Sequence, residues 1–334
     1  PPAEAELSLN IKEGSTTIID EQRGFIYGLG GYQGVDAWAD DMELTDLISQ
    51  GYLEIEGDGR LEYEYVGSNT TLGTGAKVEF INNKTGEVVE TFYIVIFGDF
   101  DGDGVTDYLP RSNSGDLGYV TGDDNKWHYI KGLGTEWKIA SVGDLDGNGL
   151  ADVLLVHSKQ GFSGTWFVTG GTPAIEWGNL STIGKKVELI GVGNVYNSTE
   201  SQDIFLKNGS TIAAWVMEEG KVKSYKGLYN VNSNMNFIGL GDFNGDGATD
   251  YLLRSKGGDL GFISSNDNKW HYFKGLGNEW KIAAIGDLNG DGRDDMVLAH
   301  ERGYCGAWLT KENIGSVKWL PADEGLIGRI RQIL

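Results

Sequence analysis

The sequence predicts a mostly β protein in which five copies of one four-stranded unit follow a smaller N-terminal module. Three observations support this prediction. The chain of 334 residues contains 52 glycines, which favour turns between short strands. Segments 97–138 and 240–281 have nearly the same sequence. An Asp/Gly-rich loop returns at steps of 45, 50, 48 and 45 residues, beginning at Asp99, Asp144, Asn194, Asp242 and Asp287.

Residues 1 to about 90 do not share the repeat, and we expect a small α+β or β-rich module there. Asp40 and Glu43, followed by Leu44, Leu47 and Ile48, are typical of a capped amphipathic helix. Strand-like runs lie at 16–19, 61–65, 77–81 and 88–93, with a turn predicted at 83–86.

Each repeat divides into four short strand-like runs. In the first repeat these runs are 93–97, 107–109, 116–120 and 127–131, separated by Gly, Asn and Asp. Four strands in about 45 residues are typical of one blade of a β-propeller. We therefore expect a five-bladed β-propeller of four-stranded blades over 91–334, with repeats starting near 97, 139, 189, 237 and 282. The final Arg329–Leu334 aligns with the strand before each loop, so it either closes the ring or begins a sixth blade.

The loops read D-x-D-G-D-G-x-x-D with small variations. Short Asp and Asn side chains on alternate residues supply the oxygen ligands that Ca²⁺ prefers, and the glycines let the backbone curl around an ion. Asp/Gly clusters also make ordinary turns, but turns do not need acids on alternate positions, and crowded carboxylates repel one another. We therefore predict four Ca²⁺ sites; the third loop, 194–203, lacks these acids and is predicted to be empty. The predicted ligands are Asp99, Asp101, Asp103, Val105 and Asp107; Asp144, Asp146, Asn148, Leu150 and Asp152; Asp242, Asn244, Asp246, Ala248 and Asp250; and Asp287, Asn289, Asp291, Arg293 and Asp295, the seventh position of each loop contributing its backbone carbonyl.

The segments GDFDGDGVTDYL, GDLDGNGLADVLL, GDFNGDGATDYLL and GDLNGDGRDDMVL resemble the FG-GAP or VCBS repeats of integrin-like β-propellers. The resemblance covers residues from about 92 to 334, and the third repeat departs from it. It implies that each loop joins the first two strands of a blade and that Ca²⁺ rigidifies the loop. Separately, residues 85–99 resemble the end of a small module that precedes calcium-binding repeats in secreted or surface proteins of Firmicutes.

The charge of the chain restricts its partners. With 49 Asp and Glu against 27 Lys and Arg, the formal net charge is −22, which repels nucleic acid. No apolar run approaches the roughly 18 residues of a membrane span, and no signal-peptide pattern is apparent. A single cysteine, Cys305, excludes a disulfide framework and a cysteine-based metal cluster.

The histidines come in two repeat-equivalent pairs, His128 with His271 and His157 with His300. A residue copied between repeats is more typical of a structural role than of catalysis, and the sequence contains no nucleophile–base motif. We therefore expect that the protein is not an enzyme. The alternatives are a polysaccharide lyase or hydrolase that uses the central funnel of the propeller, and an accessory scaffold domain without a ligand of its own.

Nine of the ten tryptophans lie in the repeats, where most are expected to pack between blades. The predicted ligand-binding residues are Trp127, His128, Trp270 and His271. The two tryptophans are the leading candidates, because their polar neighbours suit the hydroxyl groups of a sugar. We expect a secreted or cell-surface protein, bacterial in origin, that serves in adhesion or recognition of a glycan or a surface protein. Extracellular calcium modules often bind at about 10⁻⁴–10⁻³ M, which fits this location.

Overall fold

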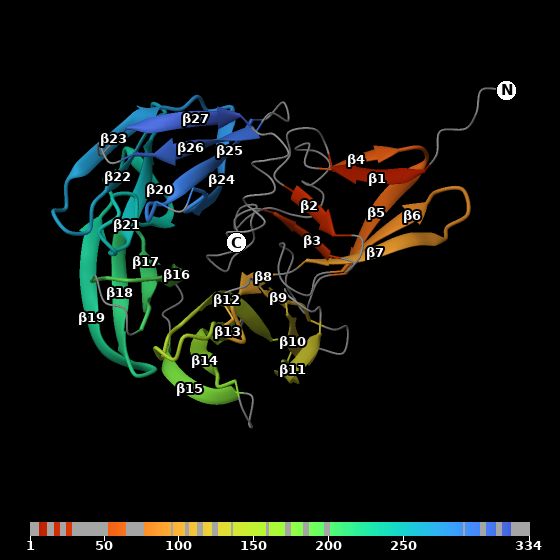
Figure 1. Ribbon diagram of the computed structural model, residues 1–334, viewed down its shortest axis with the longest axis horizontal. Helices are drawn as coiled ribbons and strands as arrows, with labels where there is room; N and C mark the ends of the chain where they lie inside the picture. The colour runs from red at the N-terminus through yellow and green to blue at the C-terminus, as the bar shows by residue number, and fades with distance from the viewer. Residues whose placement is uncertain are drawn as a thin grey trace.

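The computed structural model describes most of the repeat region and part of the N-terminal region (Figure 1). Its described residues form 27 β-strands and contain no helix, and therefore no helix long and apolar enough to cross a membrane. The predicted helix at 40–48 and the predicted last strand at 329–334 lie outside these residues. The described ranges are 7–11, 17–20, 25–28, 53–64, 77–94, 96–103, 107–111, 116–121, 126–134, 136–157, 160–170, 175–182, 187–196, 201–289, 291–300, 305–311 and 316–321.

Twenty strands form five four-stranded antiparallel sheets, in which neighbours along the chain are neighbours in the sheet. We call them repeat sheets 1 to 5. Repeat sheet 1 contains β8 (Ile96–Gly98), β9 (Asp107–Leu109), β10 (Asp116–Val120) and β11 (Trp127–Gly132). Repeat sheet 2 contains β12 (Trp137–Gly143), β13 (Asp152–His157), β14 (Phe162–Val168) and β15 (Ile175–Thr182). Repeat sheet 3 contains β16 (Val187–Gly193), β17 (Asp203–Asn208), β18 (Thr211–Glu218) and β19 (Lys221–Asn230). Repeat sheet 4 contains β20 (Met235–Gly241), β21 (Asp250–Ser255), β22 (Asp259–Ile263) and β23 (Trp270–Gly275). Repeat sheet 5 contains β24 (Trp280–Gly286), β25 (Asp295–His300), β26 (Cys305–Thr310) and β27 (Val317–Pro321).

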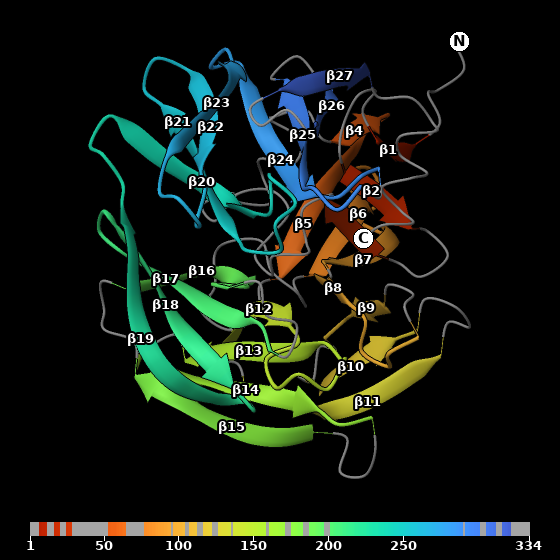
Figure 2. The same cartoon turned by 60° about the vertical axis from the view of Figure 1, so that its left-hand side comes forward.

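The repeat sheets are arranged like the blades of a β-propeller. Their first strands contact one another in chain order, β8 with β12, β12 with β16, β16 with β20 and β20 with β24. The sheets fan outward from these strands, so that β11, β15, β19, β23 and β27 lie at the periphery (Figures 1 and 2). This confirms a mostly β, propeller-like arrangement.

In the described part of the repeat region, buried apolar residues form four clusters that lie between consecutive repeat sheets. Because side chains alternate between the two faces of a strand, one strand serves two clusters. On β13, Val153 and Leu155 pack toward repeat sheet 1, whereas Leu154 packs toward repeat sheet 3. The predicted inter-blade packing of Trp166, Trp215 and Trp308 is confirmed, since all three are buried in these clusters.

The N-terminal strands form two further sheets. A two-stranded sheet pairs β1 (Ser8–Ile11) with β4 (Leu53–Glu56). A five-stranded sheet has the order β2-β3-β7-β6-β5, in which β3 and β7 are parallel. Its strands are β2 (Thr17–Asp20), β3 (Phe25–Gly28), β5 (Gly59–Glu64), β6 (Lys77–Asn82) and β7 (Val88–Ile94). In both views these strands lie on the side of the molecule between repeat sheets 5 and 1 (Figures 1 and 2).

The predicted turn between β6 and β7 is confirmed. Oδ1 of Asn82 accepts the backbone N–H of Lys84 at 2.9 Å and that of Thr85 at 3.3 Å. Gly86 has φ +72°, a backbone conformation that glycine adopts without strain.

The prediction for the first strand of the first repeat is wrong in its bounds. The apolar run 93–97 predicts one strand, but β7 ends at Ile94 and β8 begins at Ile96. Tyr93 pairs with β6 and β3 of the N-terminal region, and Ile94 pairs with β3. The start of the apolar run therefore belongs to the N-terminal sheet rather than to repeat sheet 1. The next two predicted strands, β9 and β10, have the predicted bounds.

Candidate metal centre

The Asp/Gly loops join the first and second strands of their repeat sheets. Loop 1 follows β8, loop 2 follows β12, loop 4 follows β20 and loop 5 follows β24. This is the position that the repeat resemblance implied. Loop 3, between β16 and β17, has the same place but lacks the alternating acids.

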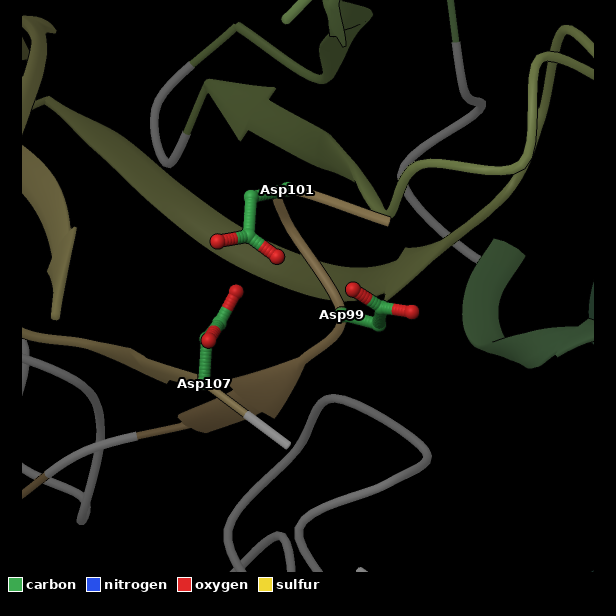
Figure 3. A group of neighbouring side chains, drawn as sticks. All are labelled: Asp99, Asp101 and Asp107. Carbon is green, nitrogen blue, oxygen red and sulfur yellow. The ribbon is translucent and has the colours of Figure 1, made fainter. Parts of the chain in front are cut away.

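Loops 1 and 2 bring three carboxylates together. In loop 1, one oxygen each of Asp99, Asp101 and Asp107 lies within 4.8 Å of the others. Figure 3 shows these three side chains around a common space, with Asp107 at the start of the following strand. In loop 2 the equivalent Asp144, Asp146 and Asp152 are equally close. Among the described residues these are the groups of three acidic side chains that meet this distance.

The other predicted ligands of loops 1 and 2 differ in their exposure and in their hydrogen-bond partners. Asp103 is exposed, and its N–H donates to Asp101 Oδ1 at 3.2 Å. Val105 lies outside the described residues. The amide of Asn148 donates to the carbonyl of Val168 at 2.8 Å, which joins loop 2 to the end of β14.

In loops 4 and 5, backbone N–H groups and asparagine side chains donate hydrogen bonds to the aspartate carboxylates. In loop 4, Asn266 Nδ2 donates to Asp246 Oδ2 at 2.5 Å, and the N–H of Ala248 donates to Asp246 Oδ1 at 2.9 Å. In loop 5, Asn289 Nδ2 donates to Asp295 Oδ2 at 3.3 Å. The N–H of Arg293 donates to Asp291 Oδ1 at 3.0 Å.

The first aspartate of each loop orders the backbone that follows it. Asp144 Oδ1 accepts the N–H of Gly147 at 2.7 Å, and Oδ2 accepts that of Gly149 at 2.9 Å. Both glycines have positive φ, +84° and +87°, which lets their N–H groups turn back toward the carboxylate. Asp242 makes the equivalent bonds with Gly245 and Gly247 in loop 4, both at 2.7 Å.

The closing aspartate, at position nine of loops 1, 2, 4 and 5 and at position ten of loop 3, is buried in every loop. Asp203 of loop 3 accepts two backbone N–H groups at 2.8 Å, those of Val195 in the loop and Met217 on the third strand. Asp107, Asp152, Asp250 and Asp295 accept the corresponding loop N–H at 2.8, 2.8, 3.2 and 3.2 Å. The last three also accept an N–H at or just after the end of their third strand, from Val168, Ser265 and Thr310 at 2.8, 3.0 and 2.7 Å. The closing aspartate therefore fastens the loop to the sheet whether or not the loop carries the other acids.

Sequence reasoning did not detect this second role. The pattern assigns position nine to a metal ligand only. Its N–H partner on the third strand lies 14 to 16 residues along the chain. A signal was nevertheless present, because loop 3 keeps a closing aspartate, Asp203, one position later than in the other loops, although it has lost the alternating acids.

Burial raises the pKa values of the closing aspartates. The pKa of Asp152 and that of Asp250 rise to about 8, and that of Asp295 rises to about 7. Loss of hydration is the main cause, and the neighbouring loop carboxylates raise these pKa values further. A cation in the loop would oppose both effects.

The donor set fits a hard divalent cation. Side-chain oxygens of Asp and Asn and backbone carbonyls are the ligands that Ca²⁺ prefers, and the predicted ligand set has no nitrogen or sulfur donor. In each of loops 1 and 2, three carboxylates lie close together. Hydrogen bonds to the first aspartate already order the backbone of the loop. The residues therefore fit Ca²⁺ in chemistry.

Consecutive loops are also joined to each other, through the residue directly before the closing aspartate. The N–H of Ala151, Gln202, Thr249 and Asp294 donates to the carbonyl of the first residue of the preceding loop, at 2.6 to 2.7 Å. Three of these side chains accept a bond in return: Gln202 Oε1 from Asp144 N at 3.0 Å, Thr249 Oγ1 from Asn194 N at 2.8 Å, and Asp294 Oδ2 from Asp242 N at 2.7 Å. The local loop pattern gives no sign of these links, because their partners are more than 50 residues apart.

The predicted ligand-binding residues lie on the outer strands of repeat sheets 1 and 4. His128 stacks on Tyr119 with ring centroids 4.8 Å apart, and His271 stacks on Phe262 at 5.0 Å. Trp127 is exposed, whereas Trp270 is half-buried and packs against the core between repeat sheets 3 and 4.

No protein-family model matches the chain, and no curated protein matches it in sequence. Solved structures with a similar fold include Raptor from Chaetomium thermophilum, at a TM-score of 0.45 and 10% identity over 68% of this chain. A putative 6-phosphogluconolactonase from Bacteroides uniformis has a TM-score of 0.41 and 11% identity, covering 79% of this chain and 83% of its own. A prolyl endopeptidase has a TM-score of 0.47 and 10% identity over 82% of this chain. The chain spans 20% of the length of Raptor and 46% of the prolyl endopeptidase.

The prediction that this chain is not an enzyme is corrected by these similarities. A putative 6-phosphogluconolactonase and a prolyl endopeptidase are among the proteins of similar fold, so this kind of fold is compatible with enzymes. Repeated histidines and a missing sequence motif do not exclude catalysis, because catalytic groups need to meet in space rather than along the chain. At identities of 10% and 11% the likeness concerns the fold and assigns no activity to this chain.

Proposed function

We propose that this protein is a calcium-stabilised five-bladed β-propeller of the FG-GAP or VCBS kind that recognises a glycan or a protein outside the cell. Loops 1, 2, 4 and 5 would each hold one Ca²⁺, and loop 3 would hold none. The five four-stranded repeat sheets would be the blades. The loops would make the propeller rigid enough to present its surface to a ligand.

The convergence of carboxylates in loops 1 and 2 carries this proposal. Asp99, Asp101 and Asp107 point their oxygens at one space, and their repeat equivalents in loop 2 do the same. Three like charges this close repel one another unless a cation lies between them. The recurrence of the pattern in four loops favours a built site over chance proximity.

Bound Ca²⁺ would supply charge neutralisation and would link the loop residues to one another. The chain's own residues prepare for it. The first aspartate holds the loop glycines, and the closing aspartate is anchored to the third strand. Loss of the ion would leave these carboxylates repelling one another across loops that also join neighbouring sheets.

The chemistry of the loops supports a location outside the cell. Modules of this kind often bind Ca²⁺ at about 10⁻⁴–10⁻³ M, a concentration found outside cells rather than in the cytosol. We therefore propose secretion or display on the surface of a bacterial cell.

Thermal unfolding with and without calcium tests the proposal. Four sites at a calcium concentration ten times their dissociation constant would contribute about 6 kcal/mol, so millimolar Ca²⁺ is expected to raise the Tm by about 8 °C relative to the chelated protein. Mg²⁺ at the same concentration serves as the control, and a much smaller rise is expected because the site offers many oxygens in an adaptable loop. A Tm that chelation leaves unchanged would contradict the proposal.

A further inference from the structure

Two nearly identical outer strands have different surroundings in this protein. β11 and β23 share the sequence Trp-His-Tyr at the same register, with Trp127 opposite Val120 and Trp270 opposite Ile263. In repeat sheet 4 this face packs on repeat sheet 3, and Tyr251 and Ile263 are buried there. Among the described residues no repeat sheet precedes sheet 1, and the equivalent Tyr108 and Val120 are only half-buried.

Trp127 is therefore the copy that meets solvent. Its side chain is 47% exposed, although its inner side lies against the backbone of β10. A β-carbon on Gly118 would come within 2.5 Å of Cζ2 of Trp127, so only glycine lets the indole lie this close to the strand. The ring is thus held against the sheet while much of its surface stays open.

Tyr129 extends this surface. It lies two residues further along β11, on the same face as Trp127, and is 56% exposed. Its hydroxyl oxygen accepts the N–H of Gly132 at 3.0 Å, which fixes the position of the ring. The exposed residues Lys126 and Lys131 lie on either side of the two aromatic residues in the sequence of this strand.

We infer that Trp127 and Tyr129 form a stacking platform for the sugar rings of a neutral polysaccharide. The inference rests on the proposed recognition function and names its site and ligand class. The polarised C–H groups on one face of a pyranose ring are attracted to the negative face of an indole. A single indole that is held against the sheet can make such a contact. The hydroxyl groups at the edge of the sugar then remain in water or form hydrogen bonds with the polar side chains beside the indole.

Other ligand classes fit this surface less well. A stable protein interface buries about 800 Å² on each partner around an apolar centre, whereas most of the exposed aromatic residues described here are spread over the outer strands of different repeat sheets. Nucleic acid bases also stack on tryptophan, but a net charge of −22 repels the phosphate backbone. The same net charge disfavours polysaccharides rich in uronic acid despite the two lysines beside the platform, so the inference is limited to a neutral polysaccharide.

Affinity electrophoresis in native gels tests the inference, with millimolar Ca²⁺ present throughout. The gels contain mixed-linkage β-glucan, hydroxyethyl cellulose, arabinoxylan or galactomannan as neutral probes, and polygalacturonate as the anionic control. The intact protein is expected to be retarded by at least one neutral polymer and not by polygalacturonate. Trp127→Ala is expected to weaken that retardation at least tenfold, and Trp127→Phe, which keeps a smaller ring on Gly118, is expected to lose less.

Trp177→Ala is the matched control. Trp177 is 49% exposed on the outer strand β15, but it makes a T-shaped contact with Trp137, with the ring centroids 5.5 Å apart. This variant is expected to be retarded as strongly as the intact protein. Equal losses in Trp127→Ala and Trp177→Ala would show general adhesion of exposed indoles and would overturn the inference.

The absence of retardation in every neutral gel would also overturn it, as would an unchanged retardation of Trp127→Ala. Thermal unfolding of the same samples separates this failure from that of the proposed function. A protein that calcium stabilises but that no neutral polymer retards has the proposed scaffold without this platform. A variant that keeps the Tm of the intact protein in calcium has lost binding rather than its fold.

Discussion

Asp203 separates two roles that the closing aspartate combines in the other loops. Its own loop lacks the alternating acids, yet its carboxylate is buried and accepts the N–H groups of Val195 and Met217. A carboxylate that accepts two backbone N–H groups ties the loop to the third strand of its sheet. The fold therefore depends on this residue even where no ion is expected.

Asp203→Ala is expected to lower the free energy of unfolding by about 2–4 kcal/mol, because two buried N–H groups lose their acceptor. Urea denaturation measures this loss, which is expected to be the same with calcium and with chelator. Asn208→Ala, at the exposed end of the same strand, is the control and is expected to change stability by less than about 0.5 kcal/mol. A loss that calcium restores would show instead that loop 3 binds the ion.

At the scale of the loops and strands, the residue directly before the closing aspartate joins loops 2 to 5 to the loop before each of them. Gln202 donates its N–H to the carbonyl of Asp144 and accepts the N–H of Asp144 with its side chain. Thr249 and Asp294 repeat this reciprocal pair in the next two junctions. The loops are therefore joined to one another as well as to their own sheets.

Gln202→Met tests one junction, because methionine has a similar length but no strong acceptor. The N–H of Asp144 is left without its partner, and the free energy of unfolding is expected to fall by about 1 kcal/mol. Gln160→Met, at an exposed position, is the matched control and should leave stability nearly unchanged. Equal stability of the two variants in chemical denaturation would mean that the side-chain bond contributes nothing.

The buried carboxylates also predict how stability depends on pH when calcium is removed. In the folded protein the pKa of Asp152 and of Asp250 is about 8 and that of Asp295 about 7, well above the usual value of about 3.9 in an unfolded chain. Between these values the folded state binds more protons than the unfolded state, so the chelated protein is expected to lose stability as the pH rises from about 5 to 8.

Saturating calcium is expected to remove most of this loss, because it favours the ionised carboxylates. Tm values across that pH range, with chelator and with calcium, provide the measurement. A chelated protein that becomes more stable as the pH rises would contradict the assignment of raised pKa values to these aspartates.

At the scale of the whole molecule, the local sequence pattern predicted strands of the repeats but not the strands and sheets that lie next to them. The alternation of apolar residues and turn residues predicted β9 and β10 with their observed bounds, because both strands depend on neighbours close in sequence. The first strand was misjudged, since Tyr93 and Ile94 pair with β6 and β3 of the N-terminal region. Trp127 and Trp270 were treated alike because their sequences match, but only one of them faces another repeat sheet.

In the metal loops too, the sequence predicted the contacts within a loop but not those between a loop and the rest of the molecule. Residue spacing predicted that Asp99, Asp101 and Asp107 would converge, and the structure brings them together. Spacing could not predict the bond from Asn148 to Val168 or the links between loops, because these depend on how strands and sheets pack. The prediction that the chain is not an enzyme rested on sequence order, which does not show how side chains meet in space.

The number of calcium ions bound per chain tests the central claim most directly. Equilibrium dialysis at millimolar calcium is expected to give four ions per chain, three for the double variant Asp144→Asn and Asp146→Asn, and four for Asn194→Ala in loop 3. A chain that retains no calcium at this concentration, or a loop 2 variant that retains as many ions as the unaltered protein, would contradict the account.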